Sequence, residues 1–311
     1  MGRVPAIAGR RSPVKILIAG ASGLIGRALV PALRAGGHEV KCLVRRHPKN
    51  PDEIEWDPIR GTLAPGALER VEAIVNLSGE NIAGGRWTKG RRERIVRSRI
   101  DATRTLVTAL DKLPHKPRVF LSASAVGFYG DRGDEMLSEK SESGHGFLPE
   151  TCLIWETHAE GAKRKGVRTV LMRFGVVLAR EGGALAKILP AFRVGLGGQL
   201  GSGLQWMSWV AREDAVRAIG YALANDACSG PINIVAPGVV TNAEFTQTLG
   251  RVLSRPTCLP LAAWAIQLAF GEMGRATLLS SGRVESRWLT KNGFAFGHPH
   301  LEPALKAILG R

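Results

Sequence analysis

A glycine-rich turn between a buried strand and a helix is the feature that most constrains the fold. Residues 14–19 (Val-Lys-Ile-Leu-Ile-Ala) form a short apolar run, which predicts a buried parallel strand. Gly20-Ala-Ser-Gly23-Leu-Ile-Gly26 follows, and residues 24–35 have the period of a helix that ends at Gly36-Gly37. Residues 39–44 predict a second strand, so this region forms one βαβ unit.

Strand and helix patterns then alternate along the chain. Further strands are predicted at 73–77, 118–123, 167–174 and 232–235, and helices at 91–110, 151–165 and 214–224. Alternation of this kind predicts a doubly wound α/β fold of the Rossmann type, with a mostly parallel sheet covered by helices on both faces.

Length and composition indicate how the chain is organised. It has 311 residues, of which 44% are hydrophobic and 23% charged, and this excludes wholesale disorder. We expect a flexible N-terminal extension (1–13), a dinucleotide-binding domain (14–178) and a smaller substrate-side region (179–311) that returns some strands and helices to the main sheet. Seven glycines in 182–203 predict no regular core structure there, but either a mobile segment over a site or a plain surface loop.

Charge and cysteine usage narrow the range of partners. The formal net charge of +16 favours anionic partners. The four cysteines are far apart and form no CxxC pair, so we expect no metal site, no disulfide framework and a reducing, cytoplasmic setting. The longest plain apolar run, 261–270, is too short to cross a bilayer, and we expect no membrane partner. Eight basic residues in 86–104 have only Trp87 as a neighbouring aromatic, which favours a solvated helix face and no nucleic-acid partner.

The glycine turn predicts a site for a dinucleotide. Gly20 permits the tight turn, Gly23 lets backbone N–H groups approach a pyrophosphate, and Gly26 lets the helix pack against the strand. The N-terminus of the helix then presents its partial positive charge to the phosphates. The alternative is a glycine turn that serves packing alone.

The end of the second strand indicates which dinucleotide is bound. An NAD site usually has Asp or Glu there, but this chain has Arg45-Arg46 and no carboxylate before Asp52. Two guanidinium groups suit a 2′-phosphate, and the Ser22 hydroxyl can add to its binding. NADP(H) is therefore predicted over NAD(H), unless Arg45 and Arg46 are ordinary surface arginines.

Several stretches together resemble one protein family. They are Gly20–Gly26, Trp56–Pro58, Asn76–Asn81, Trp87, Ser98-Arg99, Ser122–Gly130, Cys152–Glu156 and 182–209. The chain resembles the extended, epimerase-type branch of the short-chain dehydrogenase/reductase superfamily, and within it the atypical NAD-dependent epimerase/dehydratase subgroup, sometimes labelled cell-division inhibitors. The turn, the strand ends and the resemblance together predict cofactor contacts from Gly20, Ser22, Gly23, Leu24, Ile25, Gly26, Arg45, Arg46, Asp57, Leu77, Ser78, Gly79, Arg99 and Cys152.

The resemblance also locates the catalytic positions. The superfamily uses a Ser, a Tyr-x-x-x-Lys pair and an Asn, and the Ser corresponds here to Ser124 or Ser122 at a strand end. Cys152 stands at the Lys position, Leu148 at the Tyr position and Arg99 at the Asn position. The usual proton-transfer groups are therefore absent.

Other side chains are candidates for replacing them. Tyr129 either approaches the site or packs, and Glu80, with Asn81, is either an acid/base group at a strand end or part of a capped turn. Cys152 is either a small buried hydrophobe or a reactive thiol. Arg99, at the edge of an apolar helix stripe, either binds an anion or bonds strand-end carbonyls.

Residues near the substrate side are less informative. Gln205, Trp206 and Ser208 are candidates for lining a substrate cleft, with core packing as the alternative. Asp214 is predicted to begin a helix as a structural residue.

These patterns predict an NADP(H)-binding oxidoreductase or epimerase-like enzyme that acts on an unidentified small molecule, with a homodimer possible. The alternative is a non-catalytic NADP(H)-binding regulatory or partner-binding protein, favoured by Leu148 and Cys152. A conventional nucleotide-sugar epimerase is disfavoured because the Tyr–Lys pair is missing.

Overall fold

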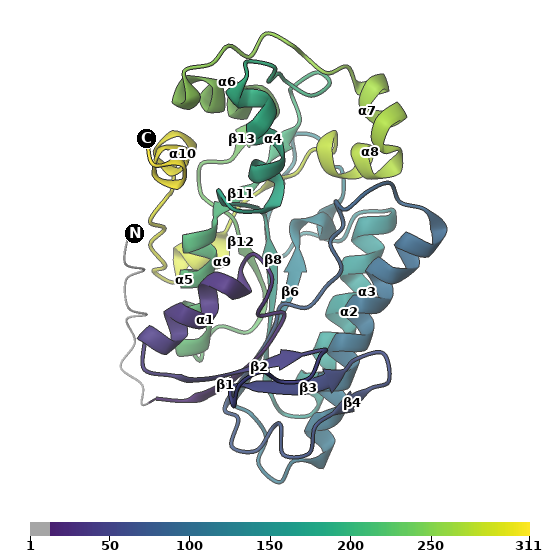
Figure 1. Ribbon diagram of the computed structural model, residues 1–311, viewed down its shortest axis with the longest axis vertical. Helices are drawn as coiled ribbons and strands as arrows, with labels where there is room; N and C mark the ends of the chain where they lie inside the picture. Colours follow the sequence, from purple (N-terminus) through teal and green to yellow (C-terminus); the bar gives the residue numbers. More distant parts are fainter. Residues whose placement is uncertain (1–12) are drawn as a thin grey trace.

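One large sheet forms the centre of the molecule (Figure 1). The computed structural model describes residues 13–311, so the extension expected at residues 1–13 lies, but for Pro13, outside the described residues. The order of the eight strands is β12-β8-β6-β5-β1-β2-β3-β4, and all neighbours are parallel except β3 and β4. The strands are β1 (Lys15–Ala19), β2 (Glu39–Val44), β3 (Glu53–Asp57), β4 (Thr62–Leu63), β5 (Ala73–Asn76), β6 (Val119–Ala125), β8 (Arg168–Phe174) and β12 (Gly230–Ile234).

Helices cover both faces of this sheet because successive strand residues point to opposite sides. Ile16 and Ile18 of β1 pack in one cluster with α1 (Gly26–Ala35) and α5 (Arg212–Ala224). Leu17 and Ala19 pack in another with α2 (Lys89–Ala109) and α3 (Phe147–Arg164). The predicted doubly wound α/β fold is therefore confirmed.

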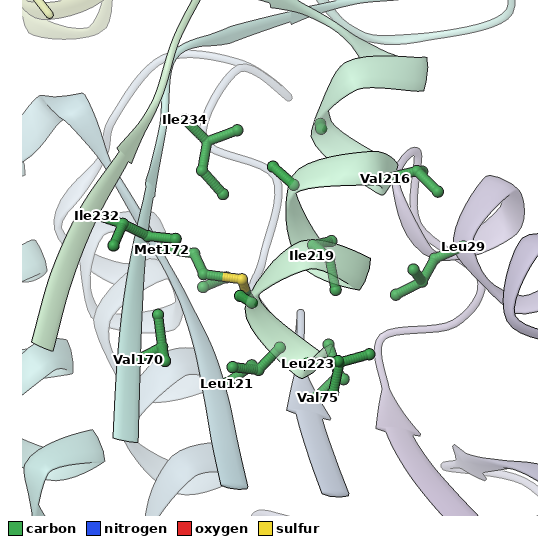
Figure 2. Packing of buried hydrophobic residues seen from close by; sticks show 14 of the residues in the cluster. Leu29, Val75, Leu121, Val170, Met172, Val216, Ile219, Leu223, Ile232 and Ile234 are labelled. Carbon is green, nitrogen blue, oxygen red and sulfur yellow. The ribbon is translucent and has the colours of Figure 1, made fainter. Parts of the chain in front are cut away.

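The α5 side of the core shows how closely the layers pack (Figure 2). Leu223 of α5 lies on the side of Val75 and Leu121 of the sheet, whereas Val216 lies toward Leu29 of α1, and all five are buried. Burying one such side chain contributes about 1.5–3 kcal/mol to folding. This packing therefore stabilises the positions of the strands whose ends carry the candidate site.

A second group of elements lies outside the large sheet and the helices that cover it. The helices α4 (Gly183–Arg193), α6 (Asn242–Leu253) and α10 (Leu301–Leu309) share a separate apolar cluster. Three small sheets pair β9 (Val176–Leu178) with β11 (Trp209–Ala211), β10 (Trp206–Met207) with β13 (Val240–Thr241), and β7 (Met136–Leu137) with β14 (Arg283–Val284). The remaining elements are α7 (Ala263–Phe270), α8 (Glu272–Leu278), α9 (Arg287–Lys291) and the 3₁₀ turns η1 (Leu110–Lys112) and η2 (Val126–Tyr129).

The expectation of no regular structure in 182–203 was wrong. Helix α4 lies within it, and Leu185, Leu189 and Phe192 are buried at the i, i+4 and i+7 positions of one helical stripe. The glycines stand at the start of this stripe and beyond its end, so they bound the helix without interrupting it. Strand β3 was not predicted, because Glu-Ile-Glu-Trp-Asp alternates polar and apolar residues and lacks the continuous apolar run that is typical of a buried parallel strand.

Residues 281–298 are hydrogen-bonded to the middle of the chain. The Ser281 hydroxyl donates to the Gly133 carbonyl (2.8 Å), and the Asn233 amide donates to the Glu285 carbonyl (2.9 Å). Asp214, in the first turn of α5, accepts from the backbone N–H groups of Gly297 and His298, both at 2.7 Å. Asp214 is thus a structural residue, and the segment after α8 is part of the main body.

Candidate functional site

In the glycine turn, segments of the backbone pack directly against one another. A Cβ at Gly20 would lie 2.6 Å from the Leu77 carbonyl carbon, and one at Gly26 would lie 2.4 Å from the Gly20 oxygen. Gly20 also has φ +83°, which L-residues rarely adopt. Gly23 differs, because its added Cβ would only touch the Gly20 oxygen at 3.3 Å, and the residue is exposed. Gly20 and Gly26 are needed to fold the turn, whereas Gly23 leaves its outer surface open.

A cavity of about 940 Å³ opens beside this turn. Its walls come from the turn, the ends of β2, β3 and β5, and α2. Eight of the predicted cofactor residues line it: Gly20, Ser22, Gly23, Arg45, Arg46, Leu77, Ser78 and Gly79. A volume near 1,000 Å³ suits a ligand larger than a typical small metabolite.

The other predicted cofactor residues lie elsewhere. Leu24 packs near Gly182 and Gly183, Ile25 is the N-cap residue of α1, and Gly26 is buried beneath the turn. The Asp57 carboxylate accepts from the backbone N–H of Ile59 (2.9 Å) and shapes its own turn. Arg99 and Cys152 lie beyond the lining of the cavity.

Arg45 and Arg46 both line the cavity but differ in their partners. Arg46 donates to both oxygens of Glu53 (2.7 and 2.6 Å), and this pairing lowers the pKa of Glu53 to about 2. Arg45 is exposed, and its guanidinium has no hydrogen-bond or ion-pair partner among residues 13–311. Arg45 is therefore the cation at the end of β2 that is available to a ligand.

The remaining charges give the cavity a positive character. Arg27, Arg94 and Arg97 also line it without a carboxylate partner in the described chain. Its carboxylates have cationic neighbours: Asp52 with Arg34 and Lys41, Glu53 with Arg46, Asp101 with Arg104, and Glu80 with Arg91 at 4.0 Å. An anionic ligand would meet attraction from several sides.

Sequence reasoning missed part of this lining. Trp56, Pro58 and Ile59 line the cavity at the end of β3, the strand that was not predicted. Arg94, Arg97, Ser98 and Asp101 line it from one face of α2. Their spacing of three or four residues was a usable signal, since it places them on the same side of a helix.

The serine and tyrosine candidates lie in a buried polar network. The Ser124 hydroxyl donates to Glu156 (2.6 Å), and Glu156 accepts two bonds from Arg173 (2.8 and 2.7 Å). The Tyr129 hydroxyl accepts from Arg173 (2.9 Å) and donates to Asn233 (2.8 Å), while burial raises the pKa of Tyr129. Both candidates are buried, and each hydroxyl proton is already donated within the protein.

Ser122 and Cys152 are also buried. The Ser122 hydroxyl donates to the neighbouring Ala123 carbonyl at 3.3 Å. Desolvation, with a smaller contribution from Glu156, raises the pKa of Cys152 to about 12, so the thiol stays protonated at neutral pH. These properties fit the reading of Cys152 as a small buried hydrophobe.

Arg99 bonds one backbone carbonyl in its own helix and one in the loop that follows β5. Its guanidinium donates to Ile95 (2.8 Å) and Glu80 (3.2 Å), and it stacks on the Trp155 indole with 5.0 Å to the ring centroid. Burial lowers the pKa of Arg99. Arg99 thus fixes the loop that presents Glu80, whose half-buried side chain lines the cavity.

The substrate-side candidates are engaged in the fold. Gln205 donates to the Leu200 and Leu278 carbonyls (both 3.0 Å), and Ser208 is buried and donates to Gly282 (2.7 Å). The Trp206 indole donates to Asp134 (2.7 Å) and stacks with Arg283.

Comparisons with known proteins identify a family and similar folds. Residues 16–235 match the model of the NAD dependent epimerase/dehydratase family, and residues 261–308 match a domain of unknown function (DUF1731). The Mycobacterium tuberculosis epimerase family protein MT2273 is 45% identical over 290 residues, which cover 93% of this chain and 96% of that protein.

Two solved structures are similar over nearly the whole chain. The crystal structure of the human epimerase family protein SDR39U1 (isoform 2) with NADPH has a TM-score of 0.87 and 33% identity, covering 96% of this chain and all of that one. The nucleoside-diphosphate sugar epimerase from Corynebacterium glutamicum has a TM-score of 0.80 and 35% identity, covering 96% of this chain and 59% of that one.

Proposed function

The chain belongs to the NAD dependent epimerase/dehydratase family, and we propose that it binds NADP(H) in the cavity beside the glycine turn. We propose further that it is an oxidoreductase or epimerase-like enzyme of the atypical extended short-chain reductase type, acting on a small molecule. The exposed guanidinium of Arg45 carries the cofactor preference, because nothing else in the described chain neutralises it. The NADPH found with human SDR39U1 supports the same choice.

The residues present fit this nucleotide. The glycine turn has an open outer surface at Gly23 where pyrophosphate oxygens can meet backbone N–H groups and the N-terminus of α1. Ser22 and Arg45 both line the cavity and would supply donors to a 2′-phosphate. Leu77, Ser78 and Gly79 line the cavity directly beside the turn. NADP(H), when bound, supplies or accepts a hydride.

Titration with nucleotides tests the cofactor assignment. NADPH should bind at least about tenfold more tightly than NADH, because a 2′-phosphate gains a charge-assisted bond to Arg45. Arg45→Ala should weaken NADPH binding about tenfold or more and leave NADH binding nearly unchanged. Arg193→Ala, at an exposed arginine outside the cavity, is the matched control. An equal loss for both nucleotides would refute the assignment.

The chemistry requires a proton donor, and Glu80 is the candidate that remains accessible. Its side chain is half-buried and lines the cavity, and its nearest cation, Arg91, is 4.0 Å away. We infer that Glu80 exchanges the proton while Arg99 holds its loop in place. Glu80→Gln should lower turnover by about 10²-fold and leave the dissociation constant of NADPH unchanged. Equal turnover in both proteins would exclude Glu80.

A regulatory NADP(H)-binding protein is the second candidate. It is favoured by the protonated Cys152 thiol and by the internal hydrogen bonds of Ser124 and Tyr129. Monitoring NADPH consumption across aldehydes, ketones and quinones separates the two functions. An enzyme would oxidise NADPH with at least one class, whereas a regulator would bind the nucleotide and oxidise none.

A further inference from the structure

Most of the large apolar side chains that are exposed in the described chain gather in one region. Eight of twelve lie between residues 194 and 270, and we call them the apolar patch: Val194, Leu196, Leu204, Leu259, Leu261, Trp264, Leu268 and Phe270. Trp264 is 71% exposed and Leu268 is 70% exposed. Exposed apolar groups on this scale indicate an interaction surface, since scattered single residues are the usual pattern.

The two segments that form the apolar patch lie side by side. Leu200 pairs with Leu261 in a β-bridge, and a Cβ at Gly198 would overlap the Leu259 carbonyl. Helix α7 contributes Trp264, Leu268 and Phe270, and Ile266 is its one buried residue. Residues 256–271 contain no charged side chain. Figure 1 shows α7 at the edge of the molecule, away from the central sheet.

The charges around the apolar patch are almost all positive. Residues 182–204 and 255–283 hold five basic residues and one acidic residue, Glu272, which is paired with Arg92 at 2.9 Å. Exposed Arg193 directly precedes Val194, and exposed Arg275 lies on α8, which packs against α7. The Arg86 guanidinium lies next to Gly271, at the end of α7.

The exposed apolar side chains and the positive charges around them favour one kind of binding partner over another. A second copy of the chain would bring the same arginines and the same +16 net charge toward this surface, so repulsion opposes its docking. An anionic lipid surface complements both features, because it accepts Trp and Leu at its interface and attracts arginine with its phosphates.

We propose that the apolar patch docks the protein on the surface of an anionic lipid bilayer. Trp264 and Leu268 enter the interfacial layer, and Arg193, Arg275 and Arg86 lie at headgroup phosphates. This departs from the expectation of no membrane partner, which considered residues 261–270 only as a membrane-spanning segment. Helix α7 has only eight residues, and in this proposal it lies along the surface. The structure of residues 13–311 contains no helix that could cross a membrane.

Vesicle flotation tests the proposal with the full chain. Wild-type protein should float with vesicles of phosphatidylcholine and phosphatidylglycerol in equal parts, and far less with phosphatidylcholine alone. Trp264→Ser and Leu268→Ser should each lower partitioning at least about tenfold, because each removes apolar area from the interface. Leu153→Ser, at an exposed leucine on α3 outside the apolar patch, should change it less than about twofold. Added salt should weaken the binding.

A dye on Cys258 gives a second readout. Cys258 is exposed beside the apolar patch, and the other three cysteines are buried, so labelling is selective. Blue-shifted emission on anionic vesicles supports docking through this surface. Absence of flotation, or flotation unaffected by both Ser variants, overturns the proposal. So does a dimer in sedimentation equilibrium that Trp264→Ser converts to a monomer, since the occupant is then a second copy. These outcomes are independent of NADP(H) binding.

Discussion

The cavity beside the glycine turn and the buried network behind it lie along the same sheet, yet they use arginine in opposite ways. Arg45 is exposed, lines an open cavity and has no partner in the described chain. Arg173 is 4% exposed and is bonded to Glu156, Tyr129 and the Glu139 carbonyl. A guanidinium whose charge the fold has neutralised stabilises the fold, while one left unpaired in a cavity is available to an anion.

The cavity and the buried network also differ in whether their residues suit ligand binding or catalysis. The open side keeps the features that a dinucleotide requires, namely the turn, the helix N-terminus and the arginines. At the positions that the resemblance to the short-chain reductases would assign to proton transfer, this chain has Leu148 and the buried Cys152. Four variants or measurements test this distinction.

The largest effect is expected from Glu156→Ala. Removing this carboxylate leaves Arg173 buried without its counter-charge, which should lower the free energy of unfolding by about 3–5 kcal/mol. Urea denaturation followed by circular dichroism measures the change. Glu160→Ala, at an exposed glutamate on the same helix, should stay within about 0.5 kcal/mol of wild type. An unchanged midpoint for Glu156→Ala would show that the network adds no stability.

The reactivity of Cys152 reports directly how well the region of the buried network is shielded from solvent. The pKa of Cys152 is raised from 9.0 to about 12, so near pH 8 its thiolate population should be about 1,000-fold below that of an ordinary cysteine. Iodoacetamide under native conditions should therefore label Cys258 and spare Cys152, as read by mass spectrometry.

The same shift has a consequence for stability. The folded state favours the protonated thiol, so this contribution is present below pH 9 and is lost as the pH rises through about 12. Cys152→Ala should flatten that part of the pH–stability curve. Rapid labelling of Cys152 at pH 8 would support the reactive-thiol reading.

Gly23→Ala tests the open region without disturbing the fold. An added Cβ meets only the Gly20 oxygen at 3.3 Å, but it occupies the surface that a pyrophosphate approaches. NADPH binding should weaken about tenfold, with little change in melting temperature. Gly282→Ala is the control, because nothing lies within 4 Å of its added Cβ. Normal NADPH binding by Gly23→Ala would show that the pyrophosphate does not bind at this turn.

The smallest effect concerns Arg46. Its bidentate pairing with Glu53 holds it away from ligands, and the pKa of Glu53 near 2 keeps that pair intact at any ordinary pH. Glu53→Gln should free the guanidinium and tighten NADPH binding by about two- to threefold, which isothermal titration calorimetry can resolve. Weaker binding would mean that Glu53 itself contributes to nucleotide recognition.

The parts of the fold that the sequence predicted are those that depend on local patterns of residues. The glycine turn, its flanking strand and helix, and the α/β alternation depend on neighbouring residues, and the structure places them within a few residues of their predicted bounds. Arg45 and Arg46 looked equivalent because Glu53, which distinguishes them, lies on a strand that alternates polar and apolar residues.

Long-range partners were not accessible in the same way. Tyr129 is bonded to Asn233, 104 residues away, and Ser124 to Glu156, 32 residues away. No period or spacing in the sequence connects such pairs. The sequence alone therefore did not decide between a catalytic and a structural role for Tyr129 and Ser124. Helix α4 was missed for a different reason, since the glycines on either side of it masked a regular apolar stripe.

The hydrogen bonds from residues 281–286 back to the middle of the chain bear on how the protein is made. Synthesis delivers residues 16–235, which match the family model, before the segment that satisfies Ser208 and Asn233. A nascent chain on the ribosome therefore holds all eight strands of the large sheet, while the Ser208 hydroxyl and the Asn233 amide still lack these partners. A premature stop before Ser281 should yield a product that cellular proteases remove, although every residue of the glycine turn is present.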